Sequence, residues 1–367
     1  MATPLCPYFG KCGGCSTQHI DYELQLKNKS KQLEGAIHFL DLKVFSGKPY
    51  FYRNRMDFIF HKNGLGLRRK GTWDVLVNVE KCVIANERIN HLLQEVRLFF
   101  CNVDYFDLCK HTGTFRYAVV RDSHKTSLTF ILNADSFNLQ EADSIIREFA
   151  EKSSADIIIV ARVPPEVDES VSNDFYVVKG EDSLQQEYLG KIFSYSTQGF
   201  FQNNQVVAEK MQQYVHGLLE NYQTSPAVLL DLYGGVGTFG IINADLFKEV
   251  IIVEEYAASV ESARQNILIN NLKNTKAITL DAKQLSKLTL QKLLFVITDP
   301  PRKGMDPKTI EQLKRLNPEV IIYISCNVQQ LSKDIIKFKN YLVKSVALFD
   351  LFPQTNHGEV VVELIKK

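Results

Sequence analysis

Two short apolar runs in this chain each lead to a side chain that can do chemistry. The run LLFVITD ends in Asp299, and the run VIIYIS is followed by Cys326. Open α/β folds place their chemistry at the carboxyl ends of parallel strands, so both side chains are expected at one site. A thiolate there can add to an electrophilic carbon, such as one in a pyrimidine ring. A lone cysteine is also commonly a small buried hydrophobe, and this motif alone leaves both interpretations open.

A glycine-rich segment, DLYGGVG, begins at Asp231 after the apolar run AVLL and precedes an expected helix. Its glycines, Gly235 among them, let the backbone turn tightly and approach a ligand closely. Glu254 ends the next strand and can accept hydrogen bonds from both hydroxyls of a ribose. The pattern G-G-x-G after an acidic residue favours S-adenosylmethionine over a dinucleotide, with Asp281 placed to contact the adenine. Asp231 and Asp281 could instead only cap strand ends.

Three cysteines lie close together near the N-terminus, with the spacing Cys6-x5-Cys12-x2-Cys15. Three soft thiolate ligands in one loop indicate a metal or a cluster. A fourth ligand would come from elsewhere in the chain. Zinc usually takes two short Cys-x2-Cys pairs, so a compact triad with a distant fourth cysteine favours an iron–sulfur cluster. The candidates for that fourth ligand are Cys82, Cys101 and Cys109.

Composition limits the class of protein. The 367 residues argue for two or three domains, and the net charge of +1, from 43 basic and 42 acidic residues, means that any basic surface must be local. No apolar stretch reaches the roughly 18 residues that a membrane helix needs, and the N-terminus has no signal-peptide pattern. Seven cysteines without such a signal do not indicate a disulfide framework, so a reducing cytoplasm is expected.

The patterning predicts three regions. Residues 1–43 hold the cysteine loop and an amphipathic helix over 22–40. Residues 44–195 form an α+β region of short strands such as RNRMDFIFH, GLGLRRKGTW and SLTFILNA, with helices over 87–101 and 139–152. In residues 196–367 strand-like runs alternate with helical ones, which predicts an α/β domain with a doubly wound, Rossmann-like parallel sheet.

Together these motifs resemble the RNA uracil-5-methyltransferases, and the resemblance runs over nearly the whole chain. Because the cysteine triad begins at Cys6, a compact member without the N-terminal TRAM barrel of some relatives is expected. The matching segments are C-x5-C-x2-C at 6–15, YRNRMDF at 52–58, EKC at 80–82, GFFQNN at 199–204, DLYGGVGTFG at 231–240, DPPRKG at 299–304, SCN at 325–327 and LFDLFPQTNHGEVV at 348–361.

The resemblance implies a mechanism and a set of ligands. The Cys326 thiolate would add to carbon 6 of uracil, carbon 5 would take the methyl group of S-adenosylmethionine, and Glu359 would remove the carbon-5 proton. Asp299 would lie at the uracil end of the site. The cofactor contacts implied are Gln202, Tyr233, Gly235 and Glu254, with Asp231, Asp281 and Asp299 beside them. A [4Fe-4S] cluster would be held by Cys6, Cys12, Cys15 and Cys82, because EKC matches the family.

The implied partner is RNA. The enzyme is expected to be a monomer that does not associate with a membrane. The compact form favours 23S ribosomal RNA, with uridine 54 of the transfer RNA T loop next. The target base would flip out of a loop, and aromatic groups near the motifs could fill the vacated stack. Those groups are Phe200, Phe201 and Tyr52, and the cations expected at phosphates are Arg53, Arg55, Arg68, Arg69 and Lys70.

Two other functions stay open. An amino-methyltransferase acting on adenine or glutamine uses a related Asp-Pro-Pro motif, but an aromatic residue usually follows it where Arg302 stands here. Such enzymes also need no cysteine nucleophile. A catalytically silent RNA-binding or RNA-folding protein could keep the fold, but it would have no need for Cys326 and Glu359.

Overall fold

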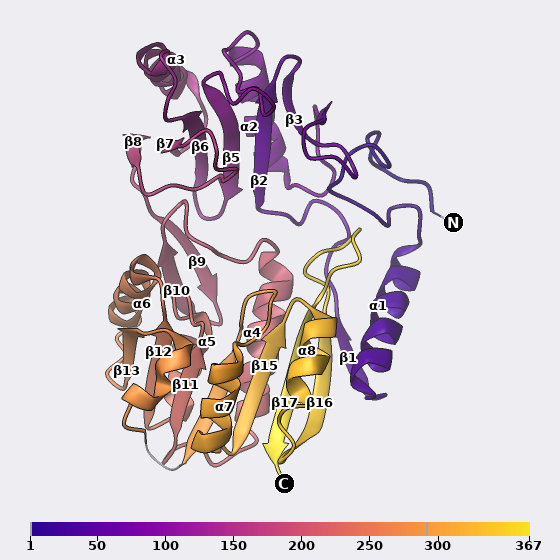
Figure 1. The fold of residues 1–367 in the computed structure, drawn as a ribbon, viewed down its shortest axis with the longest axis vertical. Helices are drawn as coiled ribbons and strands as arrows, with labels where there is room; N and C mark the ends of the chain where they lie inside the picture. The colour runs from indigo at the N-terminus through magenta and orange to yellow at the C-terminus, as the bar shows by residue number, and fades with distance from the viewer. Residues whose placement is uncertain (1, 291–292) are drawn as a thin grey trace.

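A large sheet organises the C-terminal half of the protein (Figure 1). The computed structural model describes residues 2–290 and 293–367. Within these residues eight strands form the sheet in the order β1-β16-β17-β15-β14-β11-β12-β13. Their bounds are β1 Leu42–Phe45, β11 Val228–Leu232, β12 Glu249–Glu254, β13 Thr275–Thr279, β14 Leu294–Thr298, β15 Val320–Ser325, β16 Tyr341–Phe349 and β17 Glu359–Lys366.

The sheet is mixed, and this differs from the fully parallel sheet that the alternation predicted. β17 runs antiparallel to both of its neighbours, β15 and β16. β16 and β17 are consecutive and joined only by residues 350–358, and strands joined by so short a link pair antiparallel. β1 pairs in parallel with β16, so a strand from the N-terminal part of the chain extends this sheet.

Helices cover both faces of the sheet, and a separate apolar core lies on each face. One core includes Leu229, Ile252 and Ile322, and the other includes their neighbours Leu230 and Ile321. Successive strand residues point to opposite faces, which explains these uninterrupted apolar runs. The helices are α1 Tyr22–Ile37, α4 Gln205–Leu219, α5 Thr238–Ile242, η1 Ala244–Leu246, α6 Ala257–Ile269, η2 Ala282–Lys287, α7 Pro307–Leu316 and α8 Val328–Ile335.

The middle of the chain forms a second sheet with its own core, as the α+β pattern predicted. The order of its described strands is β4-β3-β2-β5-β6-β7-β8. The predicted helix over 139–152 is confirmed, and the helix predicted from 87 ends two residues early, at Phe99. The bounds are β2 Arg55–His61, β3 Gly64–Arg68, β4 Leu76–Asn78, α2 Glu87–Phe99, β5 Phe115–Asp122, β6 Thr126–Asn133, α3 Leu139–Lys152, β7 Ile157–Val163 and β8 Phe175–Lys179.

A hairpin of β9 (Leu184–Tyr188) and β10 (Lys191–Tyr195) lies between the two sheets (Figure 1). Hydrogen bonds also join the middle sheet region to the segment between β10 and α4. Asn54, just before β2, donates from its backbone nitrogen to the Asn203 carbonyl at 3.0 Å, and Arg121 donates to the Gly199 carbonyl at 2.6 Å. The motif at 52–58 therefore lies against the motif at 199–204. None of the helices in the described part has the length and apolar character needed to cross a bilayer.

Candidate active site

The candidate catalytic side chains come from three neighbouring strands and lie at one edge of the large sheet. Asp299 follows β14, and Cys326 follows β15. Glu359 is the first residue of β17 and pairs in register with Phe349, the last residue of β16. Because β17 is antiparallel, its beginning lies where the parallel strands end. The fold thus brings together three residues that are up to 60 positions apart in the sequence.

Cys326 is half-buried between the end of β15 and the beginning of α8. Burial and the neighbouring Glu359 carboxyl raise the pKa of the thiol, and the Arg302 guanidinium lowers it. Arg302 is placed by Asn327, whose side-chain amide donates to the Arg302 carbonyl at 3.0 Å. The same Asn327 caps α8 by accepting a hydrogen bond from the Gln330 backbone at 3.2 Å. The Asp-Pro-Pro-Arg and Ser-Cys-Asn motifs are therefore joined into one structure.

Three carboxyl groups lie at this edge, of which Asp231 and Glu359 are buried and Asp299 is half-buried. Burial raises the pKa of Asp299 to about 7. Burial and the proximity of Asp299 also raise the pKa of Glu359, while Arg302 lowers it. Burial raises the pKa of Asp231 to about 7, although one of its oxygens accepts a hydrogen bond from the Gly240 backbone at 2.8 Å. A raised pKa makes each of these groups easier to protonate than an ordinary carboxyl group, and an approaching cation would favour their ionised forms.

The glycine-rich loop after β11 borders a small cavity of about 80 Å³. Gly235 has a φ of +53°, a conformation that favours glycine. Its backbone nitrogen donates to the Glu254 carboxylate at 3.1 Å, so the loop is tied to the end of β12. Four of the predicted cofactor-site residues line this cavity, namely Gln202, Tyr233, Gly235 and Asp299.

The other three predicted cofactor residues do not line the cavity. Glu254 is bonded to the glycine-rich loop at Gly235. Asp231 accepts its hydrogen bond from Gly240 in α5, the helix that follows this loop. Asp281 caps η2 and forms an ion pair with Lys283, at 2.9 Å between Nζ and Oδ2. Each of these carboxylates still has lone pairs free to accept further hydrogen bonds.

The loop 350–358, which leads into Glu359, is held by side chains from distant parts of the chain. Gln25 of α1 is only 3% exposed. Its side-chain amide donates to the Gln354 side chain at 3.0 Å and accepts from the Gln354 backbone at 3.2 Å. Tyr52 donates to the Pro353 carbonyl at 3.0 Å. A polar residue on an amphipathic helix normally faces solvent, so no sequence signal distinguished Gln25.

The first residue of that loop is anchored by a buried ion pair. Lys29 of α1 is 7% exposed, and its ammonium lies 2.6 Å from the carboxylate of Asp350, which is fully buried. Tyr22 donates to the other Asp350 oxygen at 2.8 Å, and Lys29 also donates to the Phe352 carbonyl at 3.2 Å. α1 therefore holds the loop at two places before Glu359.

We expect Lys29→Met to destabilise the protein by about 3–5 kcal/mol, because it leaves the Asp350 carboxylate buried without its cation. Urea unfolding would measure the change in the free energy of unfolding. The matched control is Lys27→Met, which removes an exposed lysine from the same helix and should change stability by less than about 0.5 kcal/mol. Equal stability of both variants would show that the Lys29–Asp350 pair does not anchor the loop.

A second cavity, of about 260 Å³, opens at Cys326. Its lining is polar and includes Lys29, Arg302 and His357. The cations Arg302 and Lys29 lower the pKa of His357, although burial is the larger cause. The thiol thus borders a site suited to a polar or anionic group, while Asp299 faces the cavity beside the glycine-rich loop.

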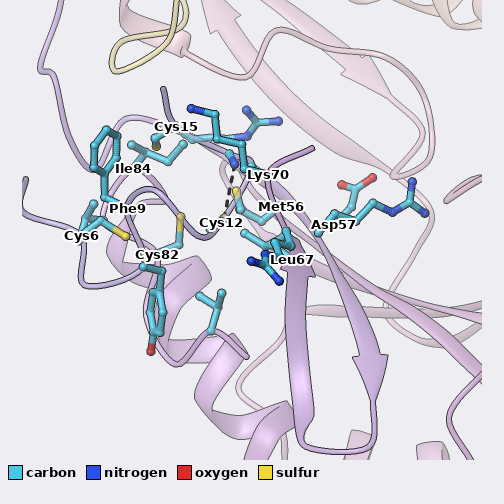
Figure 2. A pocket seen from close by; sticks show the side chains of 18 of the residues that line it. Cys6, Phe9, Cys12, Cys15, Met56, Asp57, Leu67, Lys70, Cys82 and Ile84 are labelled. Carbon is cyan, nitrogen blue, oxygen red and sulfur yellow. Dashed lines mark hydrogen bonds between the residues drawn. The ribbon is translucent and has the colours of Figure 1, made fainter. Parts of the chain in front are cut away.

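The four predicted cluster cysteines line a third cavity, of about 720 Å³ (Figure 2). Cys6, Cys12 and Cys15 come from the N-terminal loop, and Cys82 comes from the segment after β4. Burial raises the pKa of all four thiols, that of Cys15 to about 12. As these side chains stand, no three His, Cys, Asp or Glu residues of the described chain are grouped to hold a metal ion.

The cations predicted to contact RNA differ in whether they form ion pairs, and the predicted aromatic groups differ in exposure. Arg55 is paired with Asp57 at 2.9 Å and Arg68 with Asp168 at 2.6 Å. In the part of the chain that the structure describes, Arg53, Arg69 and Lys70 form no ion pair. Among the aromatic groups Phe200 is 73% exposed, whereas Phe201 stacks on Tyr195 with 4.3 Å between ring centroids.

A Rossmann-like sheet with a glycine-rich loop after its first central strand and a carboxylate after the next one is the arrangement of an S-adenosylmethionine-dependent methyltransferase. Solved structures support this class. The chain superimposes on the crystal structure of Pyrococcus abyssi tRNA (uracil-54, C5)-methyltransferase in complex with S-adenosyl-L-homocysteine, with a TM-score of 0.81 and 26% identity. The match covers 96% of this chain and 86% of that one.

The sequence comparisons identify the family. The family model described as tRNA (uracil-5-)-methyltransferase matches residues 21–367. An uncharacterized RNA methyltransferase of Caldanaerobacter subterraneus is 33% identical over 97% of this chain and 83% of its own length. The tRNA (uracil(54)-C(5))-methyltransferase of Pyrococcus abyssi is 30% identical over 99% of this chain and 86% of its own length.

The chain belongs to the tRNA (uracil-5-)-methyltransferase family. It is an S-adenosylmethionine-dependent RNA uracil-C5-methyltransferase. The predicted resemblance is confirmed, and both the amino-methyltransferase and the catalytically silent protein are set aside.

Proposed function

We propose that this enzyme methylates carbon 5 of a loop uridine in transfer RNA, at the position equivalent to uridine 54, through a covalent adduct with Cys326. The observation that carries the proposal is the meeting of Cys326, Asp299 and Glu359 at one sheet edge, beside the cavity of the glycine-rich loop. The named relatives with this fold act on transfer RNA uridine 54.

The reaction begins at Cys326. Its thiolate adds to carbon 6 of the flipped uracil, and the ring electrons shift to give an enolate that is nucleophilic at carbon 5. S-adenosylmethionine, when bound, supplies an electrophilic methyl group attached to a positively charged sulfur. Carbon 5 takes this methyl group as its bond to the sulfur breaks, and the electron pair of that bond stays on the sulfur, which becomes neutral. Glu359 then removes the carbon-5 proton, and the electron pair left behind expels the Cys326 thiolate. The methylated uridine is then released.

The cofactor would be held between the glycine-rich loop and the motif at 199–204. Tyr233, Gly235 and Gln202 line the cavity there, and Glu254 is positioned at its border for the ribose hydroxyls. Asp231 would support the loop beneath the methionine end, and Asp281 would contact the adenine. A nearby sulfonium charge would favour the ionised forms of Asp299 and Glu359. Only an ionised Glu359 can act as the base.

We expect adduct formation to become faster as the pH rises. Burial raises the pKa of Cys326, so at neutral pH only a small fraction is thiolate, and that fraction grows about tenfold per pH unit below the pKa. Arg302→Gln should move the profile toward higher pH, because Arg302 lowers the pKa of the thiol. Single-turnover rates with RNA containing 5-fluorouridine, from pH 6 to pH 9, measure this. A flat profile in both proteins would contradict a thiolate nucleophile.

The four thiols that line the third cavity fit a [4Fe-4S] cluster, held by Cys6, Cys12, Cys15 and Cys82. All four ligands would be soft sulfur atoms, and two separate segments would supply them to one space. To bind the cluster, the four cysteine side chains would have to rotate toward one another, because as they stand they form no group that could hold a metal ion. When bound, such a cluster would supply a cross-link between the N-terminal loop and the middle sheet.

We expect anaerobically purified protein to contain about four iron and four sulfide ions per chain. Cys82→Ser should lose most of this iron, because it removes the ligand from the second segment. Cys109→Ser is the matched control, since Cys109 is exposed and does not line the cavity. One zinc ion per chain without iron would contradict the cluster.

The substrate is tested by mapping 5-methyluridine in RNA from a strain that lacks the gene. Loss from transfer RNA position 54, restored by the purified enzyme on a T-arm RNA, would support the proposal. Loss from 23S ribosomal RNA alone would overturn it in favour of the ribosomal substrate that the compact N-terminus favoured. The monomeric state and the cytoplasmic location stay predictions.

A further inference from the structure

The connection between β3 and β4 carries an exposed tryptophan. A strand was predicted over GLGLRRKGTW, but β3 ends at Arg68 because Gly71, with a φ of +78°, turns the chain. Trp73 follows this turn, is the sole tryptophan of the chain, and is 60% exposed. In the described part of the chain its indole takes part in no aromatic pair or cation–π contact that the structure shows. An indole left open to solvent is a common feature of binding surfaces.

Backbone hydrogen bonds hold the connection between β3 and β4 in place. The Arg69 backbone nitrogen donates to the Val75 carbonyl at 2.8 Å, which closes the turn. Two backbone hydrogen bonds join the turn to the N-terminal loop. The Lys70 nitrogen donates to the Lys11 carbonyl at 2.8 Å, and the Gly13 nitrogen donates to the Arg68 carbonyl at 2.9 Å. The turn is therefore attached to the loop that carries the cysteines. Binding to a turn that is already fixed loses little conformational entropy.

The charges beside Trp73 suit a phosphate backbone. Arg69 and Lys70 are exposed and line the same cavity as the cysteines, with Lys70 visible at its border in Figure 2. Asp74 is the acidic neighbour in the turn, and the two cations outnumber it. Aromatic faces next to unpaired cations are the combination that binds single-stranded nucleic acid, by stacking on bases and neutralising phosphates.

The turn before Trp73 lines the cysteine cavity through Gly71 and Thr72, and this cavity adjoins the one at the glycine-rich loop. Phe200 and Phe201 line both this cavity and the one at the glycine-rich loop. RNA that contacts Phe200 at the glycine-rich loop would therefore lie beside the cavity that Arg69 and Lys70 line.

We propose that Trp73 stacks on an unpaired base of the substrate RNA, outside the target uridine, while Arg69 and Lys70 contact the adjoining phosphates. The inference rests on the proposed RNA substrate and adds a second base-binding position to it. Its role is affinity for RNA whose loop offers a free base. It has no part in the chemical steps at Cys326.

The sole tryptophan makes the test direct. A T-arm stem–loop RNA is titrated into the protein, and both the tryptophan emission and the dissociation constant are measured. Stacking should quench the emission. Trp73→Ala should weaken binding about tenfold, because a base stacked on an aromatic ring contributes about 1–3 kcal/mol. Trp73→Phe should keep most of the affinity, and the turnover rate at saturating RNA should stay unchanged in both.

The matched control is Phe137→Ala, which removes another fully exposed aromatic ring, at 103% exposure, from the connection between β6 and α3. It should leave the affinity unchanged. Affinity of Trp73→Ala within twofold of wild type, or unchanged emission at saturating RNA, would overturn the inference. If wild-type protein forms no adduct with 5-fluorouridine RNA, the proposed mechanism fails instead, and the binding measurements still decide the role of Trp73.

Discussion

Cys326→Ala is expected to abolish methyl transfer while RNA and cofactor binding remain. The thiol supplies the new bond to carbon 6, without which carbon 5 of uracil is a poor nucleophile, so the rate should fall by at least about 10⁴-fold. The substitution removes one half-buried sulfur atom at the end of β15, so the fold should be kept. Turnover of methyl-labelled S-adenosylmethionine on T-arm RNA measures the rate.

Cys101→Ala is the matched control, because Cys101 is exposed and lines none of the cavities at the glycine-rich loop, at Cys326 and at the four cysteines. It should methylate RNA at the wild-type rate. Methylation by Cys326→Ala within tenfold of wild type would mean that the reaction does not pass through a thiolate adduct.

Glu359→Gln is expected to stop the reaction at a later point. The amide is nearly the same size and keeps the packing at the start of β17, but it cannot take a proton. Adduct formation and methyl transfer should proceed, whereas release should slow by about 10²–10⁴-fold, the usual contribution of a general base. The methylated RNA should therefore remain attached to the protein on a denaturing gel.

Glu255→Gln is a suitable control, since it changes an exposed carboxylate just after β12. It should release product normally and leave no attached RNA. Normal turnover by Glu359→Gln without any attached intermediate would assign the base to another group, with the neighbouring Asp299 the first to examine.

The sequence predicted the parts of this site whose signals are local. Asp299 and Cys326 end continuous apolar runs, and a glycine-rich turn follows β11, so each could be placed on a strand end without knowing the fold. The family and its cofactor are confirmed by the comparisons. The individual roles of the site residues and the cluster stay predictions.

The parts that the sequence could not predict depend on distant segments. Glu359 was selected only through the family resemblance, because it reaches the sheet edge through the antiparallel direction of β17, and the apolar residues of EVVVELIK do not indicate that direction. Gln25 and Lys29 look like surface residues of an amphipathic helix, and their burial comes from the loop that folds against α1. The sequence also did not show that two of the cations predicted to contact RNA are already paired. Arg55 forms an ion pair with Asp57, and Arg68 forms one with Asp168.

Trapping of the covalent intermediate tests the central claim most directly. Wild-type protein is incubated with S-adenosylmethionine and a T-arm RNA whose target uridine carries fluorine at carbon 5, which cannot leave as a proton. The account predicts a stable protein–RNA complex, with the modified nucleotide attached to the peptide that contains Cys326 and carrying the transferred methyl group. Attachment at another residue, or no complex under conditions where the unmodified RNA is methylated, would contradict it.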